Sequence, residues 1–131
     1  MHPQVVKVRA GRFAICQLRA DASIPPELLR LPWYSITKTD DELSLVIPEA
    51  AGMLGDRRES GWRCLEMAGP FALSIVGVLA AISATLANAG VSIVAVSTFN
   101  TDYLLVKDAD LVGATAALRA GGYTVIDQAA P

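Results

Sequence analysis

Residues 62–70 read Trp-Arg-Cys-Leu-Glu-Met-Ala-Gly-Pro, an alternating segment that stops at a glycine and a proline. Alternation with a period of two is typical of a β-strand, and proline is favoured at the first position of a helix because its missing N–H would be unpaired there. From Ile75 onward, apolar residues recur at i, i+4, i+7 and i+11, which is one face of a helix. The sequence therefore predicts a strand followed by a helix from Pro70 to about Ala89, ended by Gly90.

Further elements follow this helix, and each is predicted from its own pattern. They are a strand over 92–97, a turn at 99–101, a strand over 103–107, a helix from Asp108 or Asp110 to Ala120, and a strand over 123–126. An aspartate can cap the start of the second helix, and Gly121-Gly122 can end it. The predicted order is β-α-β-β-α-β, the ferredoxin-like split unit.

The first sixty residues are rich in strand signals but do not repeat that order. They predict strands over 5–9 and 13–18, a short helix over 25–30, and a hairpin of strands over 34–38 and 43–47. This half is interpreted as a shortened copy of the second. We therefore expect an α+β protein of two tandem units, residues 1–60 and 61–131, with antiparallel sheets and helices mainly on one face. An exposed linker is expected near 52–60.

Composition limits the possible functions of the 131-residue chain. It is 53% hydrophobic and 18% charged, which excludes a disordered protein, and its net charge of −2 without a basic cluster argues against nucleic acid as a partner. Cys16 and Cys64 lie in apolar segments and are interpreted as reduced thiols. Because the N-terminal residues do not form a secretory signal, a cytoplasmic location is expected.

The residues between Met67 and Thr101 include no charge, and the run exceeds the roughly 20 residues that a membrane helix needs. Pro70 and the sequence Asn88-Ala89-Gly90 interrupt it, and its end changes to strand-like character. We therefore interpret it as a helix followed by a strand, and expect no membrane span.

Motifs for catalysis and for metal binding are absent from the sequence. Neither a glycine-rich phosphate loop nor G-x-S-x-G occurs, and the single histidine, His2, lies at a terminus. The cluster Asp40-Asp41-Glu42 could take Mg²⁺ or Ca²⁺, but we interpret it as a solvated hairpin turn. No catalytic residue, metal site or cofactor is therefore predicted.

Two features suit a free amino acid. The predicted helix start at 69–72 would offer unpaired N–H groups to a carboxylate, and Asp102, in the turn after the uncharged run, would bind an ammonium group. A basic ligand would call for a second carboxylate, which Glu66 could supply. The alternative is that 69–72 only starts a helix and that Asp102 only stabilises a turn.

The segment Ser97-Thr-Phe-Asn-Thr-Asp-Tyr-Leu-Leu-Val106, with 61–63, 69–71 and 32–35, resembles the ACT-domain proteins related to the regulatory part of aspartate kinases. It is similar in particular to small bacterial ACT proteins whose repeats resemble the CASTOR arginine sensors. The resemblance implies a truncated ACT-like subdomain at 1–60, a complete ACT domain at 61–131, and a homodimer. It also implies a regulatory or sensor protein without catalytic activity that binds an amino acid where two ACT units meet. Because no kinase-like segment is present, any regulated enzyme is expected to be a separate protein.

The resemblance also implies the ligand-binding positions. They are Glu66, Ala68, Gly69, Pro70 and Phe71 on one side, Ser92 and Ile93 on the other, and Thr98, Phe99 and Asp102 from the quoted segment. Structural roles are possible for several of them: Phe99 as a core or interface residue, Ser92 as the residue after a helix cap, and Glu66 as a partner of Arg63 or a lysine. Whether the shortened N-terminal half keeps a second site stays open.

Two other classes of function compete with an amino-acid sensor. The first is a dimerising interaction module without a ligand, and the second is a small enzyme on a ferredoxin-like scaffold, since that fold hosts many functions. Thermal stabilisation by amino acids would separate a sensor from a ligand-free module. The lack of a paired acid and base argues against the enzyme.

Overall fold

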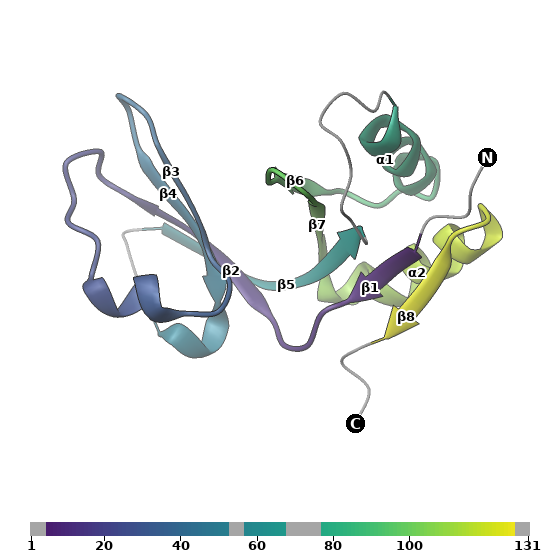
Figure 1. Ribbon diagram of the computed structural model, residues 1–131, viewed down its shortest axis with the longest axis horizontal. Coiled ribbons are helices and arrows are strands. Elements are labelled where there is room, and N and C mark those ends of the chain that lie inside the picture. Colours follow the sequence, from purple (N-terminus) through teal and green to yellow (C-terminus); the bar gives the residue numbers. More distant parts are fainter. Residues whose placement is uncertain (1–4, 53–56, 68–76, 128–131) are drawn as a thin grey trace. The chain divides into compact units, whose positions relative to one another are not determined.

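A computed structural model describes residues 5–52, 57–67 and 77–127 of the chain (Figure 1). The chain divides into two compact units. One unit, here called the inserted unit, is Gly11–Trp62. The other, here called the split unit, combines Met1–Ala10 with Arg63–Pro131, so that the inserted unit interrupts it in sequence.

The split unit has the predicted β-α-β-β-α-β order. Its elements are the last residues of β5 (Arg57–Met67), α1 (Val78–Asn88), β6 (Val94–Ser97), β7 (Asp102–Lys107), α2 (Leu111–Ala120) and β8 (Thr124–Asp127). The predicted β6–β7 hairpin is present, with Asp102 as the first residue of β7 and paired with Ser97, and α2 ends at Gly121-Gly122. The mixed α+β class and the ferredoxin-like order are thus confirmed.

A further strand, β1 (Val5–Val8), belongs to the same sheet. It runs antiparallel to β5, with Val6 opposite Met67, and parallel to β8, with Val5 opposite Thr124. The strand order is β6-β7-β5-β1-β8. The strand predicted over residues 5–9 was expected to belong to the N-terminal half, whereas residues 5–8 pair with strands more than fifty residues away in sequence.

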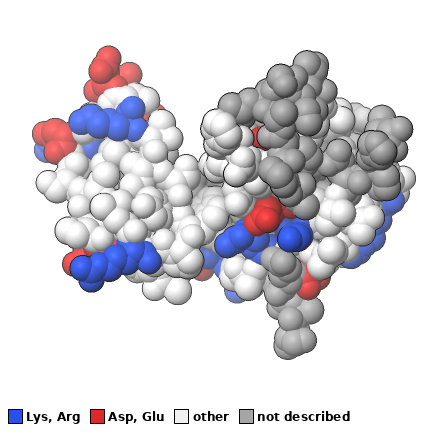
Figure 2. All heavy atoms as spheres, viewed as in Figure 1, with Lys and Arg blue, Asp and Glu red and all other residues white. Residues whose placement is uncertain are grey.

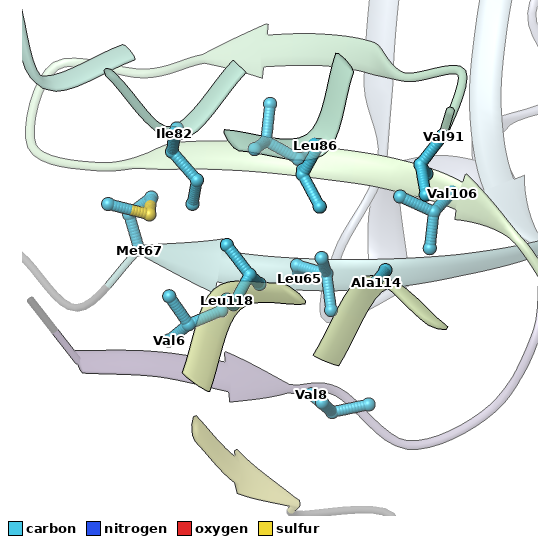
Figure 3. Close-up of a cluster of buried hydrophobic side chains, with 11 residues drawn as sticks. Val6, Val8, Leu65, Met67, Ile82, Leu86, Val91, Val106, Ala114 and Leu118 are labelled. Carbon is cyan, nitrogen blue, oxygen red and sulfur yellow. The ribbon is translucent and has the colours of Figure 1, made fainter. Parts of the chain in front are cut away.

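Both helices cover one face of this sheet and share a hydrophobic core with it (Figure 3). Val6, Val8, Leu65 and Met67 project from β1 and β5 toward Ile82 and other buried residues of the helices. The alternation of buried and half-buried positions along β1 is that of a strand with one face in the core. In the part of the chain that is described, no helix has the length and apolar character needed to cross a membrane.

The first long helix is shorter than predicted. Its expected start at Pro70 lies outside the described residues, but Gly77 has φ +88° immediately before Val78, where α1 begins. A left-handed residue cannot continue a right-handed helix, so a single helix over 70–89 is wrong. The C-terminal end is close to the prediction: α1 ends at Asn88, and Gly90 has φ +76°.

The inserted unit contains β2 (Phe13–Leu18), the 3₁₀ turns η1 (Pro26–Arg30) and η2 (Glu49–Ala51), β3 (Ser35–Lys38), β4 (Leu43–Pro48) and the first part of β5. Its strand order is β3-β4-β2-β5. The predicted β3–β4 hairpin is confirmed, with Lys38 opposite Leu43. Leu28 from η1 packs on Ala14, Cys16, Leu45 and Ile47 to form a separate core.

The predicted linker near 52–60 is in part a strand. Residues 53–56 lie outside the described ranges, but Arg57 pairs with Gln17 of β2 and Glu59 pairs with Ile15. Exposed charged side chains suggested a loop, yet backbone pairing does not need apolar side chains. The pairing shifts by one residue near Gly61, a β-bulge in which Gly61 has φ +82° and its N–H donates to Glu49 Oε2 at 2.6 Å.

Candidate functional site

The β6–β7 turn holds three of the predicted ligand-binding residues in a defined geometry. Thr98 N–H donates to the Thr101 carbonyl at 2.8 Å, and Thr98 Oγ1 accepts from Thr101 N–H at 3.1 Å. These bonds are typical of a turn closed by a threonine side chain. The side chain of Phe99 is held at the tip, where the residue is 78% exposed. Within this unit, Phe99 is therefore not a core residue.

Asp102 is half-buried at the first position of β7. Ser97 Oγ donates to Asp102 Oδ1 at 2.6 Å across the hairpin. A carboxylate has about four lone-pair positions, so this hydroxyl leaves capacity for a further donor. Asp102 can therefore stabilise the hairpin and still accept a hydrogen bond from an ammonium group.

Glu66, near the end of β5, forms an ion pair. Arg9 Nη1 lies 2.7 Å from Glu66 Oε1, and the two side chains are 29% and 18% exposed. The alternative partner considered for Glu66, Arg63, instead contacts Asp108 at 3.4 Å. A basic ligand would therefore meet a Glu66 carboxylate that is already neutralised by Arg9.

Cys64 lies beside this ion pair and is fully buried. Burial raises the pKa of its thiol from 9.0 to about 12, while Arg9 lowers the pKa and Glu66 raises it. The thiol is therefore protonated near neutral pH, and Cys64 is not a nucleophile there.

The two carboxylates of the predicted site lie on opposite faces of the sheet. Leu65 and Met67 of β5 and Leu104 of β7 project into the core beneath the helices. Because side chains alternate along a strand, Glu66 projects away from the helices, whereas Asp102 shares the face of Leu104. One copy of the split unit cannot direct both carboxylates at one small ligand.

The predicted residues are also separated along the strands. Figure 3 places Met67, which follows Glu66, and Val91, which precedes Ser92, at opposite ends of the core. Ser92 is exposed, and Ile93 packs against the core near Val91. A site that contains both Glu66 and Ser92 would therefore need two copies of the split unit, with one residue from each copy. The other predicted residues, Ala68, Gly69, Pro70 and Phe71, lie outside the described ranges.

Arg9 is the residue of this region that sequence analysis missed. Its contact depends on the pairing of β1 with β5, in which Arg9 N–H donates to the Cys64 carbonyl at 2.9 Å. The sequence signal that could have identified Arg9 was weak, because it consisted only of a cation directly after an alternating strand. Elsewhere, the visible face shows acidic and basic side chains side by side, without a continuous field of one sign (Figure 2).

Comparisons with known proteins agree with this fold. A family model described as an ACT domain matches residues 57–120, and a model of an N-terminal domain from another family matches residues 11–51. No curated protein sequence matches the chain.

Similar solved structures cover nearly the whole chain. A protein from Agobacterium tumefaciens is 32% identical with a TM-score of 0.87, over 98% of this chain and 96% of that one. A protein of unknown function from Vibrio cholerae, described as a possible transport protein, is 20% identical with a TM-score of 0.67, over 86% and 85%. The regulatory subunit of aspartate kinase from Thermus thermophilus is 11% identical with a TM-score of 0.59, over 88% and 94%. From its strand order and these matches, the chain belongs to the ACT-domain family.

Proposed function

We propose that this protein is a sensor or regulatory protein that binds a free amino acid between two ACT units and has no catalytic activity of its own. The observation that carries the proposal is the position of Asp102. Its half-buried carboxylate is oriented by Ser97 at 2.6 Å beside an exposed turn. The fold shared with a regulatory subunit of aspartate kinase supports a role in regulation, with the regulated enzyme as a separate partner in the cytoplasm.

The ligand is proposed to lie between two copies of the split unit, because within one copy the predicted ligand-binding residues lie far apart. Glu66 and Asp102 project from opposite faces, and Ser92 lies at the other end of the core from Glu66. Antiparallel pairing of β6 in two copies would bring the start of β6 in one copy, just after Ser92 and Ile93, next to the Asp102 end of the hairpin in the other, while Glu66 would stay on the opposite face of the sheet.

β6 is the edge that we propose for this homodimer. In a two-fold antiparallel pair each side chain lies near its own counterpart, so a charged strand would place like charges together. β6 reads Val-Ala-Val-Ser, whereas the edge strands β3 and β8 contain Lys38 and Asp127. An uncharged edge is suited to pairing with a second copy.

A ligand-free dimerising module is the second candidate. The 78% exposed side chain of Phe99, next to the uncharged β6 edge, favours it, since such a side chain is suited to burial against a partner. Both candidates predict a dimer, so oligomeric state alone does not separate them.

Calorimetric titration of the twenty amino acids separates the two. Asp102→Asn is expected to keep the fold, because the amide oxygen can still accept from Ser97, but to weaken amino-acid binding roughly ten- to a hundredfold by removing a charge-assisted bond. The matched control is Asp41→Asn in the exposed β3–β4 turn, which should leave affinity unchanged. Equal affinity of both variants and the parent would refute the proposed role of Asp102 in binding, and no binding at millimolar ligand would favour the interaction module.

A further inference from the structure

The sheet of the split unit has a second face, on the side away from α1 and α2, which we call the back face. Val6, Val8, Met67 and Val106 point into the core, so their neighbours in β1, β5 and β7 point the other way. The charged side chains that this alternation places on the back face are Lys7, Arg9, Glu66 and Lys107.

The charge of the back face is opposite in sign to that of the chain. Three cations and one anion give it a net charge of +2, whereas the whole chain carries −2. A local excess of one sign attracts ligands of the other sign.

Arg9 and Glu66 neutralise each other within this face. Their 2.7 Å contact is largely shielded from water, with 29% and 18% of the side chains exposed. A lysine or arginine ligand that bound Glu66 would have to displace Arg9, so one ion pair would replace another. The exchange would also leave the Arg9 charge partly buried without its partner, which is unfavourable.

The Arg9–Glu66 pair leaves two cations on the back face, Lys107 and Lys7, and Lys7 is the one beside this pair. In the register of the sheet it lies directly opposite Glu66 on one side and Ile126 on the other. Lys7 is half-buried, and its ammonium group has no hydrogen bond or ion pair within residues 5–52, 57–67 and 77–127. An ammonium in such a position gains most from an anionic group that arrives with a ligand.

We propose that the back face selects an amino acid with an acidic side chain: Lys7 binds the side-chain carboxylate, and Arg9 excludes basic ligands by occupying Glu66. This inference goes beyond the proposed function, because the back face is a separate surface on the side of the sheet opposite to Asp102. It is an alternative to the expectation that Glu66 would attract a basic side chain.

Calorimetry with matched ligand pairs tests the assignment. Aspartate and glutamate are compared with asparagine and glutamine, which have the same shape without the charge, and with lysine. The parent is expected to bind the acidic ligands about tenfold or more tightly than the amides. Lys7→Gln should bring that ratio to about one and leave amide binding unchanged, and Arg9→Gln should strengthen lysine binding severalfold because Glu66 is released. Lys38→Gln, at the exposed end of β3, is the control and should change neither ratio.

Succinate, a dicarboxylate without an ammonium group, distinguishes failure of this inference from failure of the proposed function. If amino acids bind but acids and amides bind equally, the ligand class is wrong and the sensor function stands. If succinate binds in a Lys7-dependent way while no amino acid binds, the anion-selective face stands and the sensor function is wrong. Absence of binding by both ligand types would overturn both.

Discussion

Replacement of Gly61 with alanine is expected to lower the free energy of unfolding by about 1 kcal/mol. Gly61 has φ +82°, and a Cβ built there meets no atom within 4 Å, so crowding adds nothing to the cost. The cost is the left-handed backbone, roughly 1–2 kcal/mol for a residue with a Cβ, less about 0.4–1 kcal/mol because alanine restricts the unfolded chain. For a domain of this size the change corresponds to about 3–5 °C in Tm.

Gly113 gives a matched control for the same substitution. It lies in α2 without a positive φ, and a Cβ there also meets nothing within 4 Å. Gly113→Ala should therefore stabilise the protein by about 0.5–1 kcal/mol, since alanine favours helix. Gly61→Asn should cost less than Gly61→Ala, because asparagine tolerates the left-handed region.

Urea unfolding followed by circular dichroism measures all three variants, provided that the slope m is unchanged. The two alanine variants should move the midpoint in opposite directions. If Gly61→Ala is as stable as the parent, the left-handed bulge in β5 does not constrain the fold, and the explanation of the register shift is wrong.

Other changes test the core, a titrating group and the sheet edge. Leu86→Ala, at a fully buried position of the core, should cost about 2–5 kcal/mol in urea unfolding, against less than about 0.5 kcal/mol for Val112→Ala at an 81% exposed one. Because the pKa of Cys64 is raised from 9.0 to about 12 in the folded protein, only the unfolded thiol ionises between those values. Stability should therefore fall as pH rises above 9, and Cys64→Ala should reduce the slope; an unchanged slope would contradict the burial argument. If the protein forms the proposed β6-edge dimer, Ala95→Lys should convert that dimer to monomers in sedimentation, and an unchanged dimer would exclude this edge.

Local patterns were sufficient to predict the order of elements in the split unit. The alternation before Met67, the helical spacing through Leu86 and the glycines after α2 each act over a few residues. Strand pairing was not predictable in the same way. Nothing in residues 5–8 specifies that their partners are β5 and β8, because backbone hydrogen bonds carry no sequence code. The start of α1 was missed because Gly77 lies inside an apolar run that continues the helical spacing.

The residues of the candidate site differ in the same way: those in a local hairpin were predictable from the sequence, and those that depend on strand pairing were not. Asp102 was placed at the β6–β7 turn because a short hairpin fixes its residues from sequence alone, and the Ser97 contact then follows from the register. The ion pair of Arg9 with Glu66 links residues 57 positions apart and depends on which strand lies next to β5. The opposite directions of Glu66 and Asp102 likewise became clear only when both strands were aligned in one sheet.

The position of β1 has a consequence for synthesis on the ribosome. Residues 5–8 are made well before their partner β8, which ends at Asp127, so that edge of the sheet can close only after nearly the whole described chain has emerged. The inserted unit is contiguous in sequence, so it can form its hairpins early. During that time the backbone N–H and C=O groups of β1 that will pair with β8 stay exposed. Strand pairing between residues so far apart in sequence is slow, and an unpaired strand is prone to pair with another nascent chain. Folding yield should therefore depend on translation speed and on chaperones more than the small size of the protein suggests.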